Sequence, residues 1–240
     1  DVRHSLIVKS IIFFLLHPLM INSALSKNMD KQLLSNKLEE ILNLKNDDLL
    51  RDLFLKKSFD QFNKRYKAFK EKYKDAKWSI QQVRNEKDKS LINVKIISTR
   101  EINDQIYNLN TKQTVQLETY NNKIKGYKVI KEESILNSQK SPLIIKIISP
   151  DKVFTGQKYE INLVIENPLS NALTASGMIL LKNEDNINLS NDIFGIKPNQ
   201  SGGLFKYVQA PLNPGSQTFS AIITHPEGIY TITKKIKVDL

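Results

Sequence analysis

The spacing of hydrophobic residues along the chain changes near Trp78, from a helical period to a strand period. Before this point, the clearest segment repeats large apolar residues three or four positions apart: Leu55, Phe59, Phe62, Tyr66, Phe69 and Tyr73. This spacing places them on one face of a helix. An aromatic stripe lines a ligand cavity in some proteins, but large rings more often form the core. We therefore expect the stripe to pack against a sheet.

The flanking segments extend this pattern. KQLLSNKLEEILNL predicts an earlier helix, and Asn46 before two aspartates predicts the cap and acidic first turn of the next one. After Trp78, apolar and polar residues alternate in runs that predict strands: WSIQQV, LINVKIIS, QIYNL, QTVQLETY and KIKGYKVIKEESI. Helices followed by a meander of strands indicate an α+β fold, with the helices packed on one curved antiparallel sheet.

This order of elements resembles the nuclear transport factor 2-like (cystatin-like) superfamily. The resemblance covers roughly residues 47–136 and rests on the long aromatic helix, on AKWSI and on VKIISTREI with IYNLNTKQTVQLETYNNKIKGYKVIKEESIL. It implies an α+β cone, in which the sheet wraps around the helices and leaves a pocket at its mouth. Together with the segment before it, this part forms a predicted first domain over residues 27–136.

Some members of that superfamily catalyse isomerisation or dehydration with an acid or base in the pocket. Such chemistry would need a carboxylate near tyrosine hydroxyls, away from water. The candidate pocket residues are Tyr66, Trp78, Arg100, Glu101, Tyr107, Glu118 and Tyr120. Because no motif selects among them, surface charges and core tyrosines remain the competing interpretation.

The second half is predicted to be an all-β domain over residues 143–240. Short apolar runs alternate there with turns rich in proline, glycine and asparagine, which is typical of an immunoglobulin-like sandwich. Without cysteines it resembles bacterial immunoglobulin-like modules. NSQKSP, residues 137–142, is the predicted linker. SGGLFKY runs into a strand rather than a helix, so its glycines predict a turn and no phosphate-binding loop.

Residues 1–26 have the pattern of a signal peptide. Arg3 and Lys9 precede the apolar run IIFFLLHPLMI, and NSALS offers small residues for cleavage before Lys27. The apolar run is shorter than the about 20 residues of a membrane span. The whole chain also resembles uncharacterised exported proteins of cyanobacteria. We therefore expect export to the periplasm or thylakoid lumen; an uncleaved anchor in the inner membrane and a buried core helix are the alternatives.

The net charge of +11 comes mostly from lysine, since arginines number only 5. Arginine is the residue favoured for reading bases, so we expect no nucleic-acid partner. Part of the charge forms a basic face on the aromatic helix: Lys56, Lys57, Lys64, Arg65, Lys67, Lys70, Lys72 and Lys74. This face is either solvated or in weak contact with an anionic membrane surface.

The chain has no cysteine and 3 histidines, of which only His225 lies beyond the signal segment. This composition excludes disulfides and thiol nucleophiles and leaves little imidazole chemistry. We expect no cofactor and no metal. The main hypothesis is a noncatalytic binding or assembly protein of the cell envelope, acting on a protein partner or as a homodimer. The alternatives are a small-molecule carrier or isomerase-like enzyme that uses the cone, and a peripheral membrane protein.

Overall fold

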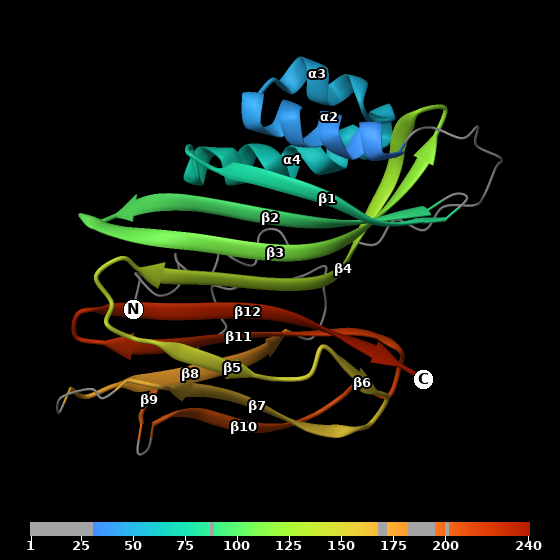
Figure 1. Ribbon diagram of the computed structural model, residues 1–240. Coiled ribbons are helices and arrows are strands. Elements are labelled where there is room, and N and C mark those ends of the chain that lie inside the picture. The colour runs from blue at the N-terminus through green and yellow to red at the C-terminus, as the bar shows by residue number, and fades with distance from the viewer. Residues whose placement is uncertain (1–30, 87–88, 168–171, 182–194, 200–201) are drawn as a thin grey trace.

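The computed structural model describes residues 31–86, 89–167, 172–181, 195–199 and 202–240 (Figure 1). The predicted signal peptide, residues 1–26, lies outside this range. The described chain starts with three helices, and every later described element is a strand. The helices are α2 (Lys31–Leu44), α3 (Asp47–Asp52) and α4 (Lys56–Lys72). None of them is long and apolar enough to cross a membrane.

The described strands form two sheets. The larger sheet has the order β1-β2-β3-β4-β12-β11-β8-β9, with β6 added in parallel to β12, and the smaller one has the order β10-β7-β5. The strands of the larger sheet are β1 (Lys77–Glu86), β2 (Lys89–Ile102), β3 (Gln105–Tyr120), β4 (Lys123–Ser138), β6 (Lys152–Phe154), β8 (Ala175–Leu181), β9 (Lys197–Pro198), β11 (Gly215–His225) and β12 (Gly228–Asp239). Those of the smaller sheet are β5 (Ile145–Ile148), β7 (Lys158–Ile165) and β10 (Gly203–Gln209).

The prediction of an α+β cone followed by a separate immunoglobulin-like sandwich is wrong. The protein is mostly β, and the last strand of the chain continues the sheet of the first half. Strand β12 pairs antiparallel with β4, from Tyr230 opposite Asn137 to Lys235 opposite Glu132. The first two residues of the predicted linker thus belong to β4. An alternating pattern predicts a strand but not the neighbour of that strand, because edge pairing depends on distant parts of the chain.

Two hydrophobic cores lie on opposite faces of the larger sheet. The first core joins the helices to β1–β4, and the second joins the larger sheet to β5, β7 and β10. Strand β11 contributes to both, because Ile222 packs in the first core and Ile223 in the second. Figure 1 shows this order, with the helices at the top, the larger sheet continuing from β4 to β12, and β7 and β10 at the bottom.

The aromatic stripe on α4 lies in the first core, as its spacing predicts. Phe59, Tyr66 and Phe69 are buried, and Tyr73 just after the helix is only 1% exposed. The ring of Phe69 meets that of Trp78 on β1 edge-on, with centroids 5.6 Å apart. The helical period therefore identified the face that packs against the sheet.

Candidate functional site

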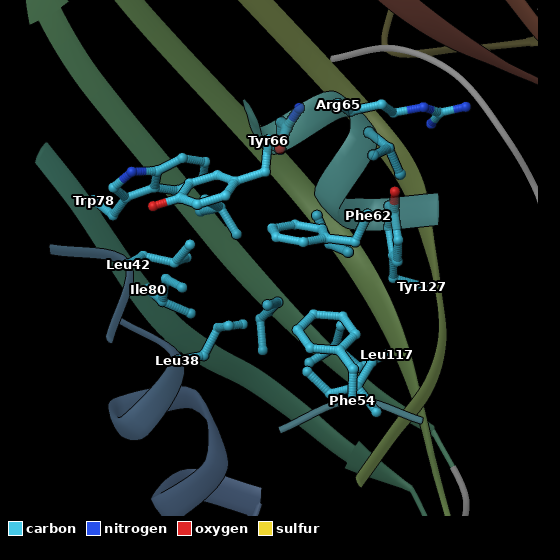
Figure 2. A pocket seen from close by; sticks show the side chains of 16 residues that line it. Leu38, Leu42, Phe54, Phe62, Arg65, Tyr66, Trp78, Ile80, Leu117 and Tyr127 are labelled. Atoms are coloured by element: carbon cyan, nitrogen blue, oxygen red, sulfur yellow. The ribbon is translucent and has the colours of Figure 1, made fainter. Parts of the chain in front are cut away.

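The interior of the first core contains a small apolar cavity of about 60 Å³ (Figure 2). Leucines of α2, the ring of Phe54 between α3 and α4, two rings of α4 and the inward side chains of β1–β4 surround it. Pockets that hold a small organic ligand usually measure about 300–1,000 Å³. The cavity is therefore too small for a metabolite, and the helices largely fill the space that the cone hypothesis requires.

Two of the predicted pocket residues, Tyr66 and Trp78, line this cavity. Their ring centroids are 6.3 Å apart, and Figure 2 shows the Tyr66 ring beside the indole. Burial, and secondarily the carboxylate of Asp47, raise the pKa of Tyr66 to about 12. The hydroxyl of Tyr66 thus remains protonated at neutral pH and cannot act as a base there.

The other predicted pocket residues do not line the cavity. Tyr107 is buried and donates a hydrogen bond to Gln105 Oε1 at 2.8 Å. The guanidinium of Arg100 lies 5.8 Å from the ring centre of Tyr73. Glu101 is exposed, Glu118 is half-buried and Tyr120 is exposed. The structure therefore does not bring the candidate carboxylates and tyrosine hydroxyls together at the cavity.

The predicted basic face follows the solvent side of α4. Five of its lysines are exposed: Lys56, Lys57, Lys64, Lys67 and Lys74. Arg65, Lys70 and Lys72 are half-buried. Lys70 Nζ forms an ion pair with Asp47 Oδ1 at 2.7 Å. Burial raises the pKa of Tyr127, and the nearby charge of Arg65 partly offsets this rise. The lysines thus cover the outside of a helix, and only Arg65 borders the cavity.

A larger groove, of about 460 Å³, lies on the opposite face of the same sheet. Its floor consists of the side chains that alternate with the core residues of β1–β3, and its wall comes from β4, β12 and the segment before β6. The floor residues are Ser79, Gln81, Asn93, Lys95, Lys112 and Thr114, and the wall residues are Lys131, Glu133, Asp151 and Lys234. The lining also includes Val94, Gln113, Glu132 and Lys235. The volume falls in the range of small-ligand pockets.

Two lysines of the floor lie directly opposite each other. Lys95 on β2 pairs in register with Lys112 on β3, and Lys112 in turn faces Glu133 on β4. Both lysines are exposed, and neither forms an ion pair with a described residue. Like charges directly opposite across an antiparallel pair are destabilising. The groove therefore has an excess of positive charge that the described residues do not neutralise.

The wall of the groove has its own charge balance. Asp151 contacts Lys234 Nζ at 3.0 Å and Lys131 Nζ at 3.4 Å. The hydrogen bond from Lys234 is the main cause that holds the pKa of Asp151 below its ordinary value. Lys234 is nearly buried and also donates to the carbonyl of Ser149 at 3.3 Å. Asp151 thus anchors the loop before β6 to the sheet, while Lys95 and Lys112 form no ion pair with any residue that the structure describes.

A buried carboxylate lies beneath the groove. Glu132 accepts hydrogen bonds from Gln113 Nε2 at 2.7 Å and from Ser134 Oγ at 3.0 Å. Burial raises the pKa of Glu132 to about 7, although these hydrogen bonds and the nearby charge of Lys235 lower it. Glu132 is among the residues that line the groove, but it is 2% exposed and both of its oxygens accept hydrogen bonds from protein groups. We interpret it as part of the seam between β4 and β12.

Sequence reasoning missed the groove. The alternation of β2 and β3 indicates that Lys95 and Lys112 point away from the apolar face, and that signal is visible in VKII and TKQT. Their adjacency depends on the register between the two strands, and the position of Asp151 depends on the pairing of β12 with both β4 and β6. No local pattern contains this information.

Comparison with known proteins gives one partial match. Residues 140–239 match the model of a family described as a domain of unknown function, DUF8623. The search of curated proteins finds no match, and no nuclear transport factor 2-like match supports the resemblance over residues 47–136. The matched segment includes Asp151 and Lys234, whereas Lys95 and Lys112 precede it. The groove therefore combines residues from inside and outside this segment.

Proposed function

We propose that this protein is a noncatalytic binding protein of the cell envelope and that its polar groove takes an anionic ligand. The observation that carries the proposal is the pair of Lys95 and Lys112, which face each other in a hollow of about 460 Å³ and form no ion pair with a described residue, although Glu133 lies across from Lys112 on β4. An anion between the two ammonium groups would convert their repulsion into attraction. The envelope location rests on the signal pattern of residues 1–26.

The side chains around the groove favour binding over catalysis. The ionisable floor residues are lysines, and the acids of the wall are held by lysines or face them across strands. A lysine ammonium supplies charge and hydrogen-bond donors but no acceptor. The same arrangement serves a protein that holds a ligand or assembles with an acidic partner.

The test measures binding of anionic polymers to the full chain. Fluorescence anisotropy with labelled polygalacturonate, polyglutamate and polyphosphate is compared with uncharged dextran. The double variant Lys95→Gln/Lys112→Gln should weaken binding to the anionic polymers about tenfold, with little change for dextran. The matched control, Lys56→Gln/Lys57→Gln on α4, removes the same charge and should have a smaller effect. Equal losses in the two variants, or no binding of any anion, would contradict the proposal.

A second candidate function is peripheral binding to an anionic membrane. The observation that favours it is the row of exposed lysines on α4, which are worth up to about 1 kcal/mol each near an anionic bilayer. Vesicles that contain phosphatidylglycerol separate the two functions. Membrane docking predicts binding that fades with salt and is lost in Lys56→Gln/Lys57→Gln, whereas the groove function predicts no dependence on α4.

A further inference from the structure

We infer that the ligand of the groove is an anionic saccharide, which binds with its charges on Lys95 and Lys112 and its hydroxyls on the neighbouring amides and hydroxyls. This inference rests on the proposed function and specifies the chemical class of its ligand. The groove floor gives the first reason. Around the two lysines it presents only polar side chains, namely those of Ser79, Gln81, Asn93 and Thr114.

The amide of Asn93 is oriented for recognition. Thr114 Oγ1 donates a hydrogen bond to Asn93 Oδ1 at 3.0 Å, which fixes the amide plane and leaves its NH₂ group as a donor. Asn93 lies on β2 two positions before Lys95, so both side chains stand on the same face of the strand. A ligand that bears a charge and a hydroxyl a few ångströms apart can engage both residues.

A peptide fits this floor poorly. Peptides are recognised by strand addition at a free edge, by apolar or aromatic grooves, or by arginine clusters. Strands β2 and β3 are paired on both edges, which leaves no edge for strand addition beneath the ligand. Val94 is the single apolar residue among the described residues of the lining, and it is 6% exposed because its side chain packs in the first core.

The lining also argues against nucleic acid. Single strands bind by stacking their bases on aromatic rings, and bases are read by the fork of arginine. The described lining of the groove contains neither an aromatic residue nor an arginine. A neutral saccharide would leave the two lysines without a counter-charge. A saccharide that carries carboxylate, sulfate or phosphate groups satisfies both the lysines and the polar floor.

Lysine does not distinguish between these acidic groups, because its ammonium is a point charge without the planar fork of arginine. The shared chemistry is therefore a ring with several hydroxyls and at least one anionic group. The volume of about 460 Å³ accommodates a short stretch of such a chain and not a long polymer. Binding by the lysines should weaken with salt, while the contact with Asn93 should be less sensitive.

The test compares three labelled probes of matched length on the full chain: oligogalacturonate, oligoglutamate and neutral maltooligosaccharide. Oligogalacturonate should bind about tenfold more tightly than the other two. Asn93→Ala should weaken oligogalacturonate about fivefold and leave oligoglutamate unchanged, because it removes one hydrogen-bond donor and no charge. The control Asn110→Ala removes an exposed amide on the same face of β3, outside the groove, and should change neither.

The outcomes separate the inference from the proposed function. If oligoglutamate binds as tightly as oligogalacturonate and both are lost in Lys95→Gln/Lys112→Gln, the saccharide inference is overturned while the anionic groove stands. If neither anion binds, both are overturned. Tight binding of the neutral probe would also overturn the inference. A phosphorylated maltooligosaccharide, as a further arm, identifies which anionic group the lysines prefer. Circular dichroism of each variant confirms that it is folded.

Discussion

Asn43 and Trp78 exchange two hydrogen bonds although they lie on a helix and a strand. Asn43 Nδ2 donates to the carbonyl of Trp78 at 2.9 Å, and the Trp78 N–H donates to Asn43 Oδ1 at 2.9 Å. Two residues further along β1, the Ile80 N–H donates a hydrogen bond to Glu39 Oε2 at 2.6 Å. These side chains of α2 occupy backbone groups of β1 at the open edge of the larger sheet. Exposed edges are templates for aggregation, and α2 covers this one.

Replacing Asn43 with alanine should therefore destabilise the protein. The variant leaves the N–H and C=O of Trp78 without their partners, at a cost of about 1–2 kcal/mol in the free energy of unfolding. Urea denaturation followed by circular dichroism measures the change. Glu40→Ala, at an exposed position of the same helix, is the control and should change the stability by less than about 0.5 kcal/mol. Equal stability of the two variants would show that the hydrogen bonds of Asn43 to the backbone of Trp78 do not stabilise the protein.

Substitution of Gly203 should be strongly destabilising. A Cβ at this position would lie 2.0 Å from the carbonyl oxygen of Leu163 on β7, and the φ angle is +151°. Because the clash is with backbone, β10 and β7 would have to separate, so Gly203→Ala should cost about 2 kcal/mol or more. A Cβ at the adjacent Gly202 meets nothing within 4 Å, which makes Gly202→Ala the matched control. Thermal unfolding of both variants tests the difference; similar midpoints would show that β10 can move at little cost.

Glu132 should make the stability depend on pH. Its pKa of about 7 in the folded protein lies above the value of about 4.3 for an unfolded glutamate, so the folded state binds a proton more tightly. The stabilisation that comes from protonated Glu132 is fully present below the unfolded pKa and is lost as the pH rises through about 7. Between about pH 5 and pH 8 the loss is on the order of 3 kcal/mol.

Glu132→Gln should abolish this part of the pH profile. The amide cannot ionise, so the free energy of unfolding, measured by urea denaturation at several pH values, should fall less in the variant than in the wild type. Lys235 is the charged residue that faces Glu132 from β12, and it remains in the variant. The exposed Glu101→Gln serves as the control and should retain the wild-type profile. Parallel profiles for Glu132→Gln and the wild type would exclude this role.

Lys95→Gln should stabilise the protein while it weakens ligand binding. Lys95 is chosen because its cross-strand neighbours are Lys112 and Ser79, whereas Lys112 also faces the acidic Glu133. Removing one of two cationic side chains that lie opposite each other relieves a repulsion of roughly 0.2–1 kcal/mol. Differential scanning calorimetry at low salt should show a higher unfolding midpoint, and the gain should shrink as salt screens the charges. Lys128→Gln, at an exposed position of β4 outside the groove, should not change the midpoint in this way. A lower midpoint for Lys95→Gln would mean that the pair is held for stability and not for a ligand.

The local part of the fold was accessible from the sequence. The three- and four-residue spacing on α4 identified the buried face that ends at Tyr73. The alternation in LINVKIIS predicted a strand with one apolar face, and Ile92, Val94 and Ile96 of that face are buried in β2. These periods arise from the backbone geometry of one element. They depend only on neighbours along the chain.

The predicted fold class, an α+β cone followed by a sandwich, was wrong, because the pairing of β12 with β4 joins residues almost a hundred positions apart into one sheet. The same pairing positions Asp151 beside Lys131 and Lys234 and so builds the wall of the groove. The sequence by itself determined which side of α4 is apolar and which segments alternate as strands. Only the tertiary structure decided which strand edges meet, because many edges offer equivalent backbone hydrogen bonds and the choice among them depends on packing across the whole chain.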